Sequence, residues 1–291
     1  MNATALSVAL RWNWDPVIVA ALAASAVLYG RGLRSLWSKG TGRGVSVVET
    51  SAFAGGLLVV ATALLSPIDT LAASLFWVHM VQHMLLIVVA APLLVLGRPL
   101  LVLAQGLPRD WRRRLHGAPA RKNALALAIA TWILHTAVVW AWHLPVLFQA
   151  ALTNPALHAM EHAMFLGTAL AFWWWLIDPA ARRSVGGGLA VAYTIAAGVQ
   201  GMILGSLMLF SGAPWYPAYA KGARAFGLTP LQDQQLAGLV MWIPPGLVYL
   251  VAAALLFLSY LRAVERETLR NEQRELAAAP SSNGHVREAI G

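Results

Sequence analysis

Long apolar segments alternate with short polar connections along most of the chain. The apolar segments cover residues 16–36, 46–66, 75–96, 124–142, 156–177, 189–210 and 235–261. An α-helix needs about 20 apolar residues to cross the hydrocarbon core of a bilayer, and these segments are close to that length. The pattern therefore predicts an all-α fold, a polytopic membrane helix bundle with seven transmembrane helices over residues 16–262.

The composition agrees with a membrane protein and narrows the chemistry. Hydrophobic residues make up 59% of the chain and charged residues 11%, whereas soluble domains carry about 25% charged residues. There is no cysteine, which excludes a disulfide, a thiolate metal site and a cysteine nucleophile. A bound metal would therefore have to use histidine, methionine, carboxylate or backbone ligands.

Arginine and lysine are concentrated in alternate connections between the apolar segments. Eighteen of the 21 basic residues lie at the end of the first segment or follow the first, third, fifth or seventh segment, and the other three are Arg11, Lys221 and Arg224. Because basic loops stay in the cytoplasm, this bias predicts an N-terminus outside and a C-terminus in the cytoplasm. The net charge of +9 then reflects topology and anionic lipid, and we expect no nucleic-acid partner.

The two ends of the chain are predicted to lie outside the bundle. Residues 1–15 form an extracytoplasmic N-terminal segment, and they contain no basic stretch ahead of an apolar core, so we expect no signal peptide. Residues 263–291 are charged and then rich in alanine, serine and glycine, which predicts a cytoplasmic, partly disordered tail.

Four of the eight histidines form two HxxxH pairs, His79 with His83 and His158 with His162. In an α-helix, residues four apart lie on one face, with ~6 Å between their Cβ atoms, so each pair presents two imidazoles in one direction. Imidazoles are costly inside a bilayer, which makes an intramembrane pair a functional hypothesis. The predicted topology puts both pairs in the outer turns of their helices, so we expect them at one level of the membrane.

Other polar residues fall near the same predicted level. His143 ends the fourth segment and Asp233 precedes the seventh, both on the outer side. Asp233 could orient a ligand histidine, or it could serve as a helix N-cap. His135 lies eight residues, ~12 Å, deeper than His143, where an interhelical packing role is the simpler interpretation. His116 and His285 are predicted to be cytoplasmic surface residues.

The donor set favours a soft or borderline metal ion. Two pairs could supply three or four nitrogen ligands, which suit Cu, Zn, Fe or Ni. Methionines are interleaved with the pairs, namely Met80, Met84, Met160 and Met164. Thioether with imidazole and no thiolate favours Cu(I). The alternatives are that the histidines form interhelical hydrogen bonds and that the methionines fill the core or face lipid.

Three other functions fit parts of the pattern. The HxxEH spacing of His158, Glu161 and His162 matches inverted zincins, in which the glutamate acts as general base, but the other pair would then have no role, so we expect no enzyme. The second alternative is a b-type membrane cytochrome, in which one histidine from each pair holds a haem. A metal-ion transporter is the third, although His135 is the one deep residue that could continue a path inward.

Several stretches together resemble the CtaG-like (caa3-type) cytochrome c oxidase assembly factors, a family of seven-helix membrane proteins. They are HMVQHMLLIVVAAPLLVLGRP (79–99), WAWHLPVLFQAAL (140–152), HAMEHAMFLGTALAFWWWLID (158–178) and the region from GVQGMILGSLMLFSGAPWYPAYA (198–220) to LTPLQDQQLAGLVMWIPPGL (228–247). The resemblance spans about residues 12–262.

The resemblance implies a non-enzymatic role in maturing a haem–copper oxidase in the bacterial plasma (inner) membrane. It implies an oxidase subunit as partner and a role in copper supply, but it does not settle the metal. The donor set favours Cu(I), with zinc or haem as alternatives, and the oligomeric state stays open. It carries over, as metal-site residues, His79, His83, His143, His158, His162 and Asp233.

Overall fold

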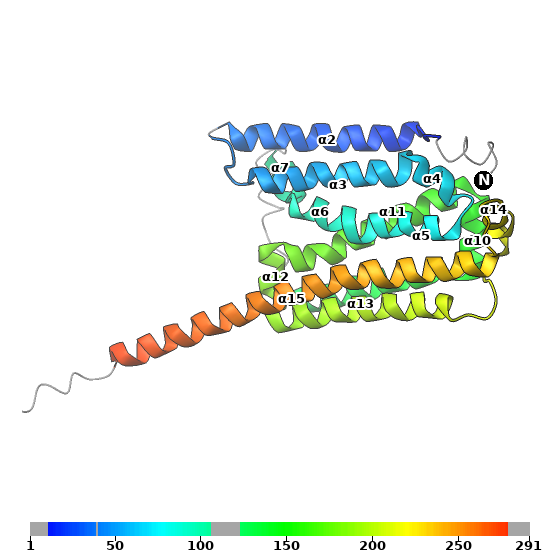
Figure 1. Cartoon of the computed structure of the whole chain (residues 1–291). Helices are drawn as coiled ribbons and strands as arrows, with labels where there is room; N and C mark the ends of the chain where they lie inside the picture. Colours follow the sequence, from blue (N-terminus) through cyan, green and yellow to red (C-terminus); the bar gives the residue numbers. More distant parts are fainter. Residues whose placement is uncertain (1–10, 39, 106–122, 279–291) are drawn as a thin grey trace, which may run out of the picture.

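The computed structural model describes residues 11–38, 40–105 and 123–278, and this part of the chain is helical, with no strand. Six helices are long: α2 (Pro16–Trp37), α3 (Val47–Leu65), α9 (Ala124–Trp142), α11 (Pro155–Ile177), α13 (Gly187–Leu209) and α15 (Pro230–Ala278) (Figure 1). A further span is built from α5 (Phe76–Met84), the π-helix η1 (Leu85–Ala90) and α6 (Ala91–Leu96). The shorter elements are α4 (Pro67–Ala72), α7 (Pro99–Gln105), α10 (Pro145–Thr153), α12 (Pro179–Val185), η3 (Pro217–Tyr219) and α14 (Ala220–Ala225).

Six helical stretches, one of them α5–η1–α6, are long and apolar enough to be candidate membrane spans. Helices α11 and α12 give a seventh candidate if they count as one span bent by 76°. Each predicted apolar segment coincides with one of these helical stretches, which confirms the all-helical membrane fold. The last helix is longer than predicted, because α15 continues to Ala278. The first part of the predicted tail is therefore helical, and residues 279–291 lie outside the described residues.

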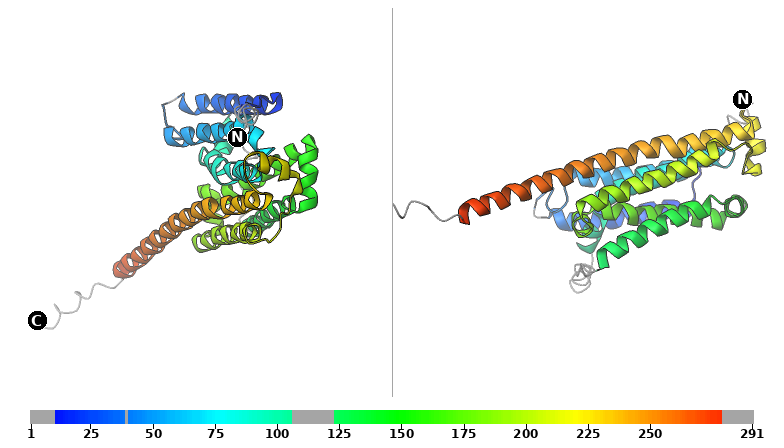
Figure 2. Two further views of the ribbon diagram at one scale, coloured as in Figure 1. Left: turned by 45° about the vertical axis from the view of Figure 1, so that its right-hand side comes forward. Right: turned by 90° about the horizontal axis from the view of Figure 1, so that it is seen from below.

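The spans run side by side in a bundle, with α2 and α3 along one side and α13 with α15 along the other (Figure 1). The α5–η1–α6 span lies between them and packs against α3, α11 and α15. The short helices α4, α10 and α14 gather at one end, which we call the α10 end. The last part of α15 projects from the opposite end (Figure 2).

Small residues allow the close contact between α13 and α15. A Cβ atom on Gly205 would lie 2.8 Å from the carbonyl oxygen of Gly238, and one on Gly238 would lie 2.6 Å from that of Gly205. Both distances are below normal contact, so only glycine fits at either position. This is the usual way in which membrane helices bring their backbones together.

The central span changes its winding immediately after Met84. Residues Leu85–Ala90 form a π-helix, in which hydrogen bonds run to the fifth residue along the chain. The carbonyl of Ile87 accepts a hydrogen bond from Nε1 of Trp173 on α11, at 2.9 Å. Short π segments occur often at functional sites, and this one directly follows the first HxxxH pair.

Candidate metal centre

The helix that carries His79 and His83 begins with a cap supplied by another helix. Leu75, the residue before α5, makes no side-chain capping bond. Instead, the fully buried Asp233 of α15 accepts the backbone N–H of Phe76 and of Trp77, each at 3.0 Å. Both carboxylate oxygens are thus occupied by amides. Asp233 belongs to neither of the two groups of possible metal ligands described below, and its contacts fix the start of α5.

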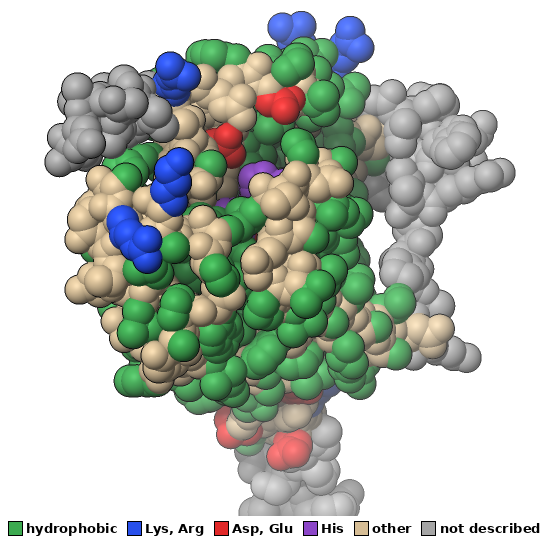
Figure 3. Space-filling model, turned by 90° about the vertical axis from the view of Figure 1, so that its right-hand side faces the viewer, with side chains coloured by type: hydrophobic (Ala, Val, Ile, Leu, Met, Phe, Trp, Pro, Cys, Tyr) green, Lys and Arg blue, Asp and Glu red, His purple; other side chains and the backbone are tan. Residues whose placement is uncertain are grey.

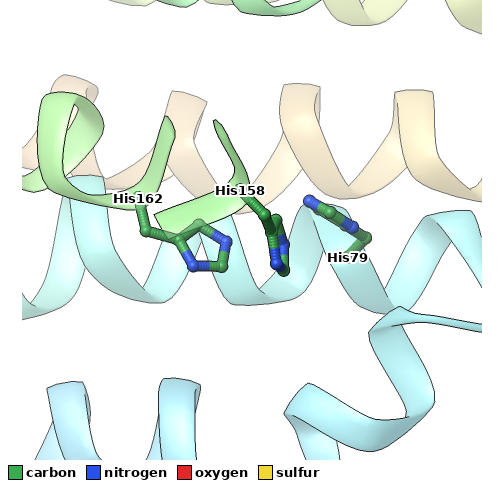
Figure 4. A group of neighbouring side chains, drawn as sticks. All are labelled: His79, His158 and His162. Atoms are coloured by element: carbon green, nitrogen blue, oxygen red, sulfur yellow. The ribbon is translucent and has the colours of Figure 1, made fainter. Parts of the chain in front are cut away.

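The second pair lies near the start of α11, which is capped within its own chain segment. Asn154 accepts the backbone N–H groups of Ala156 and Leu157, and Pro155 occupies the first helical position. This start leaves His158 and His162 one turn apart on α11. In Figure 4 the ring of His158 lies between the ring of His162 and that of His79 on α5.

The two HxxxH pairs come together in space. One ligand atom each from His79, His158 and His162 lie within 4.8 Å of one another. A second group with the same spacing contains His79, His83 and Glu161. We call these five residues, from α5 and α11, the His cluster. His79 belongs to both groups, so one ion could occupy either of them.

Hydrogen bonds orient the rings of the first pair. Nε2 of His79 lies 2.8 Å from Nε2 of His83, which requires a proton between them, and Nδ1 of His79 lies 2.8 Å from the hydroxyl of Tyr219. Burial raises the pKa of Tyr219 well above its ordinary value, so its hydroxyl stays protonated. A bound ion would replace the shared proton, and Tyr219 would then accept Nδ1–H and hold the ring toward the ion.

Glu161 is the most unusual member of the His cluster. Its side chain is fully buried, and neither carboxylate oxygen has a hydrogen-bond partner among the residues that the structure describes. The nearest basic group is Nε2 of His83, at 3.8 Å. A buried carboxylate without a partner is very costly, whereas a cation beside it compensates that cost. Glu161 is part of the HxxEH motif, but an acidic residue inside a span is itself a pointer to function.

His143 lies beside the His cluster, at the end of α9. Its ring centroid is 6.0 Å from that of His83. Nδ1–H donates to the carbonyl of Val139 at 2.6 Å, and Nε2 faces the sulfur of Met80 at 3.4 Å. Burial lowers the pKa of His143 to about 4, so the ring is neutral at neutral pH.

The other histidines lie elsewhere. His135 is buried in α9, where Nδ1 lies 2.9 Å from the hydroxyl of Thr168 and the ring packs against Phe172. These contacts fit an interhelical packing role. His116 and His285 lie outside the described residues.

The His cluster can be reached from the α10 end. Seen from that end, a histidine lies at the bottom of a hollow with acidic side chains beside it (Figure 3). His158 is half-buried, whereas the other members of the His cluster are buried. Asp69, also at this end, accepts hydrogen bonds from Asn13 and Gln82. Negative charge beside such a hollow attracts cations.

The His cluster also borders an apolar groove on the side of the bundle. The groove has a volume of about 630 Å³ and lies between α2, α3 and α11. His162 contributes to its wall together with Val17, Leu22, Leu57 and Leu166. The site therefore adjoins both the hollow at the α10 end and the apolar side of the bundle.

Comparison with known proteins gives one match. The sequence model of the family described as cytochrome c oxidase caa3 assembly factor matches residues 27–263. No curated protein and no solved structure matches the chain.

Proposed function

This chain belongs to the family of cytochrome c oxidase caa3 assembly factors, and from that membership we propose that it binds copper in the His cluster and delivers it to a haem–copper oxidase. The family role requires an oxidase as partner, and the candidate spans require a bilayer. The binding of copper in the His cluster and its delivery to the oxidase are our proposal.

The buried carboxylate of Glu161 is the observation that carries the metal assignment. It lies beside the imidazoles of His79 and His83 without a hydrogen bond from the described part of the chain, an arrangement that a cation would stabilise. Imidazole nitrogens suit copper and zinc. Copper is the metal that a haem–copper oxidase needs, and an exchangeable site at a helix end suits a carrier.

The distribution of charge supports an orientation with the His cluster on the outer side of a bacterial plasma membrane. Among the described basic residues, Arg11, Lys221 and Arg224 lie in segments at the α10 end, whereas Arg34, Arg98 and Arg182 lie at or near helix ends on the opposite side. The positive-inside rule favours the end richer in arginine as cytoplasmic. The hollow above His158 would then open outside the cell.

The apolar groove supports lateral transfer to a membrane-embedded recipient. A recipient subunit could approach the wall that contains His162 without the ion leaving the membrane region. A non-enzymatic carrier of this kind needs ligands that can be exchanged one by one, and the two overlapping groups that share His79 provide them.

The proposal is tested by loading and transfer. Metal-free protein, purified in detergent, is titrated anaerobically with Cu(I), and the copper content of the oxidase is measured in cells with and without the chain. We expect one bound copper per chain, no Soret band of haem, and an oxidase deficient in copper when the chain is absent. A protein that retains no copper, or an oxidase with full copper content in its absence, would contradict the proposal.

Glu161→Gln keeps the side-chain volume and removes the charge. We expect the affinity for Cu(I) to fall about 10- to 100-fold, because one ligand is weakened and the compensating charge is lost. The metal-free variant should unfold at the same or a higher temperature than the metal-free wild type, since glutamine avoids the cost of a buried carboxyl group that has no partner. Competition with a Cu(I) chelator and thermal unfolding measure the two effects.

The matched control is Glu49→Gln on α3. Glu49 is half-exposed and pairs with Arg98 at 3.8 Å, away from the His cluster. This variant should bind copper as the wild type does. Equal affinity of the Glu161→Gln variant and the wild type would remove Glu161 from the site.

A further inference from the structure

We propose that Met80 and His143 form a thioether–imidazole position beside the His cluster, and that this position makes the centre selective for Cu(I). The inference rests on the proposed function of the His cluster as a copper site and adds two ligands from outside it. It also assigns a role to one methionine among several.

The contact between the two side chains joins two hydrogen-bond acceptors. The carbonyl of Val139 can only accept, so the proton of His143 must be on Nδ1. A neutral ring with its proton on Nδ1 has a lone pair at Nε2, and this lone pair faces the Met80 sulfur at 3.4 Å. A thioether sulfur is itself only a weak acceptor, so no hydrogen lies between them. Two buried lone pairs that face each other in this way fit a shared cation.

Both groups are held in place by the surrounding structure. Met80 is fully buried and His143 is 2% exposed. The hydroxyl of Tyr216 donates to the backbone carbonyl of His143 at 2.6 Å, which fixes the residue that ends α9. The two ligand atoms therefore face each other before any ion binds, and little conformational entropy is lost on binding.

The separation suits one ion between the two atoms. A metal ion bound about 2.0 Å from the nitrogen and about 2.3 Å from the sulfur leaves these two atoms 3.4 Å apart when the nitrogen–metal–sulfur angle is near tetrahedral. His83 offers a third ligand, because its ring lies 6.0 Å from that of His143 and its Nδ1 is unpartnered in the described ranges. Met80 directly follows His79 and lies three residues before His83, so an ion in the His cluster is within reach of it.

The other described methionines are placed differently. Met160, Met164 and Met202 are exposed on the outside of the bundle, Met84 is half-buried at the end of α5, and Met208 and Met241 are buried where α13 meets α15. Met80 is thus the methionine that the structure sets against a histidine nitrogen. Thioethers bind Cu(I) and contribute little to the binding of Zn(II). The expected consequence is selectivity between these two ions.

Met80→Leu tests the proposal with a side chain of similar volume that lacks sulfur. Copper K-edge X-ray absorption on the anaerobically loaded wild type should show a sulfur neighbour at about 2.3 Å, and the variant should lack it. The affinity of the variant for Cu(I) should fall at least about 10-fold, while its affinity for Zn(II) stays unchanged. Met164→Leu, which changes a lipid-facing methionine on α11, should behave as the wild type.

The outcomes separate the inference from the function on which it rests. Copper bound by nitrogen and oxygen alone in the wild type, or a sulfur neighbour that persists in Met80→Leu, would overturn the inference and leave the copper carrier intact. Equal losses of Cu(I) and Zn(II) affinity in Met80→Leu would also overturn it, because they would indicate a packing defect. A wild type that binds no copper would overturn both proposals.

Discussion

Alanine at both His79 and His83 is expected to abolish copper binding and to lower active oxidase to the level of cells without the protein. Every group that could hold an ion in the His cluster includes His79, and the second group also needs His83. Without them, the His cluster retains only His158, His162 and Glu161, all of which lie on α11. Copper content after anaerobic loading and oxidase activity in membranes measure the two effects.

The single variants should not contribute equally. His79→Ala removes a member of both groups and should bind nearly as poorly as the double variant. His83→Ala leaves the group of His79, His158 and His162 and should retain weakened binding. Their effects should therefore not add, as is usual for residues that act on one ion.

His135→Ala is the matched control for the double variant. It also removes a buried imidazole inside a span, together with its hydrogen bond to Thr168, but it lies apart from the His cluster. We expect lower stability with normal copper binding. Loss of copper in this control, or retention of copper in the double variant, would show that the His cluster is not the binding site.

The second large effect is expected for Asp233→Ala. This change leaves the amide groups of Phe76 and Trp77 without their acceptors in a buried position. Each buried donor that loses its partner costs about 1–3 kcal/mol, so the expected loss of stability for the two donors is about 2–6 kcal/mol. The first turn of α5 contains His79, so copper affinity should fall as well. Thermal unfolding followed by tryptophan fluorescence and Cu(I) competition measure the two effects.

Asp15→Ala is the control for the capping effect. Asp15 accepts two amides at the start of α2, as Asp233 does for α5, but the hydrogen bonds lie at the surface, where water can replace them. We expect a loss of about 0.5–1 kcal/mol and unchanged copper binding. If the Asp233→Ala variant were as stable as the Asp15→Ala variant, the cap that α15 supplies to α5 would contribute no more stability than the cap on α2.

The bilayer explains why the fold could be predicted well. A spanning helix must satisfy its backbone hydrogen bonds internally and must be apolar over its length, so the helices can be read from composition alone. The end of α15 was harder to predict from composition, because residues 262–278 are charged. They are also rich in arginine, glutamate, alanine and leucine, which have high helix propensity, and that feature points to the longer helix.

The candidate site could be predicted only in part. The HxxxH spacing predicts that each helix presents two imidazoles on one face, and the structure brings the two pairs together. The roles of Asp233, Glu161 and Met80 depend on which faces of α5, α9, α11 and α15 meet, and that follows from tertiary packing. Helical spacing cannot distinguish Met80 from Met84, although only Met80 lies against His143.

The cap on α5 also has a consequence for the order in which the protein is made. Asp233 comes 157 residues after Phe76, so the helix with the first histidine pair leaves the ribosome long before its cap exists. The hydrogen bonds that fix the start of α5 form only after α15 has been inserted into the membrane. A nascent or truncated chain would have the histidines without a fixed start to their helix. Complete synthesis is therefore a condition for a fixed start of α5 and for the arrangement of the His cluster.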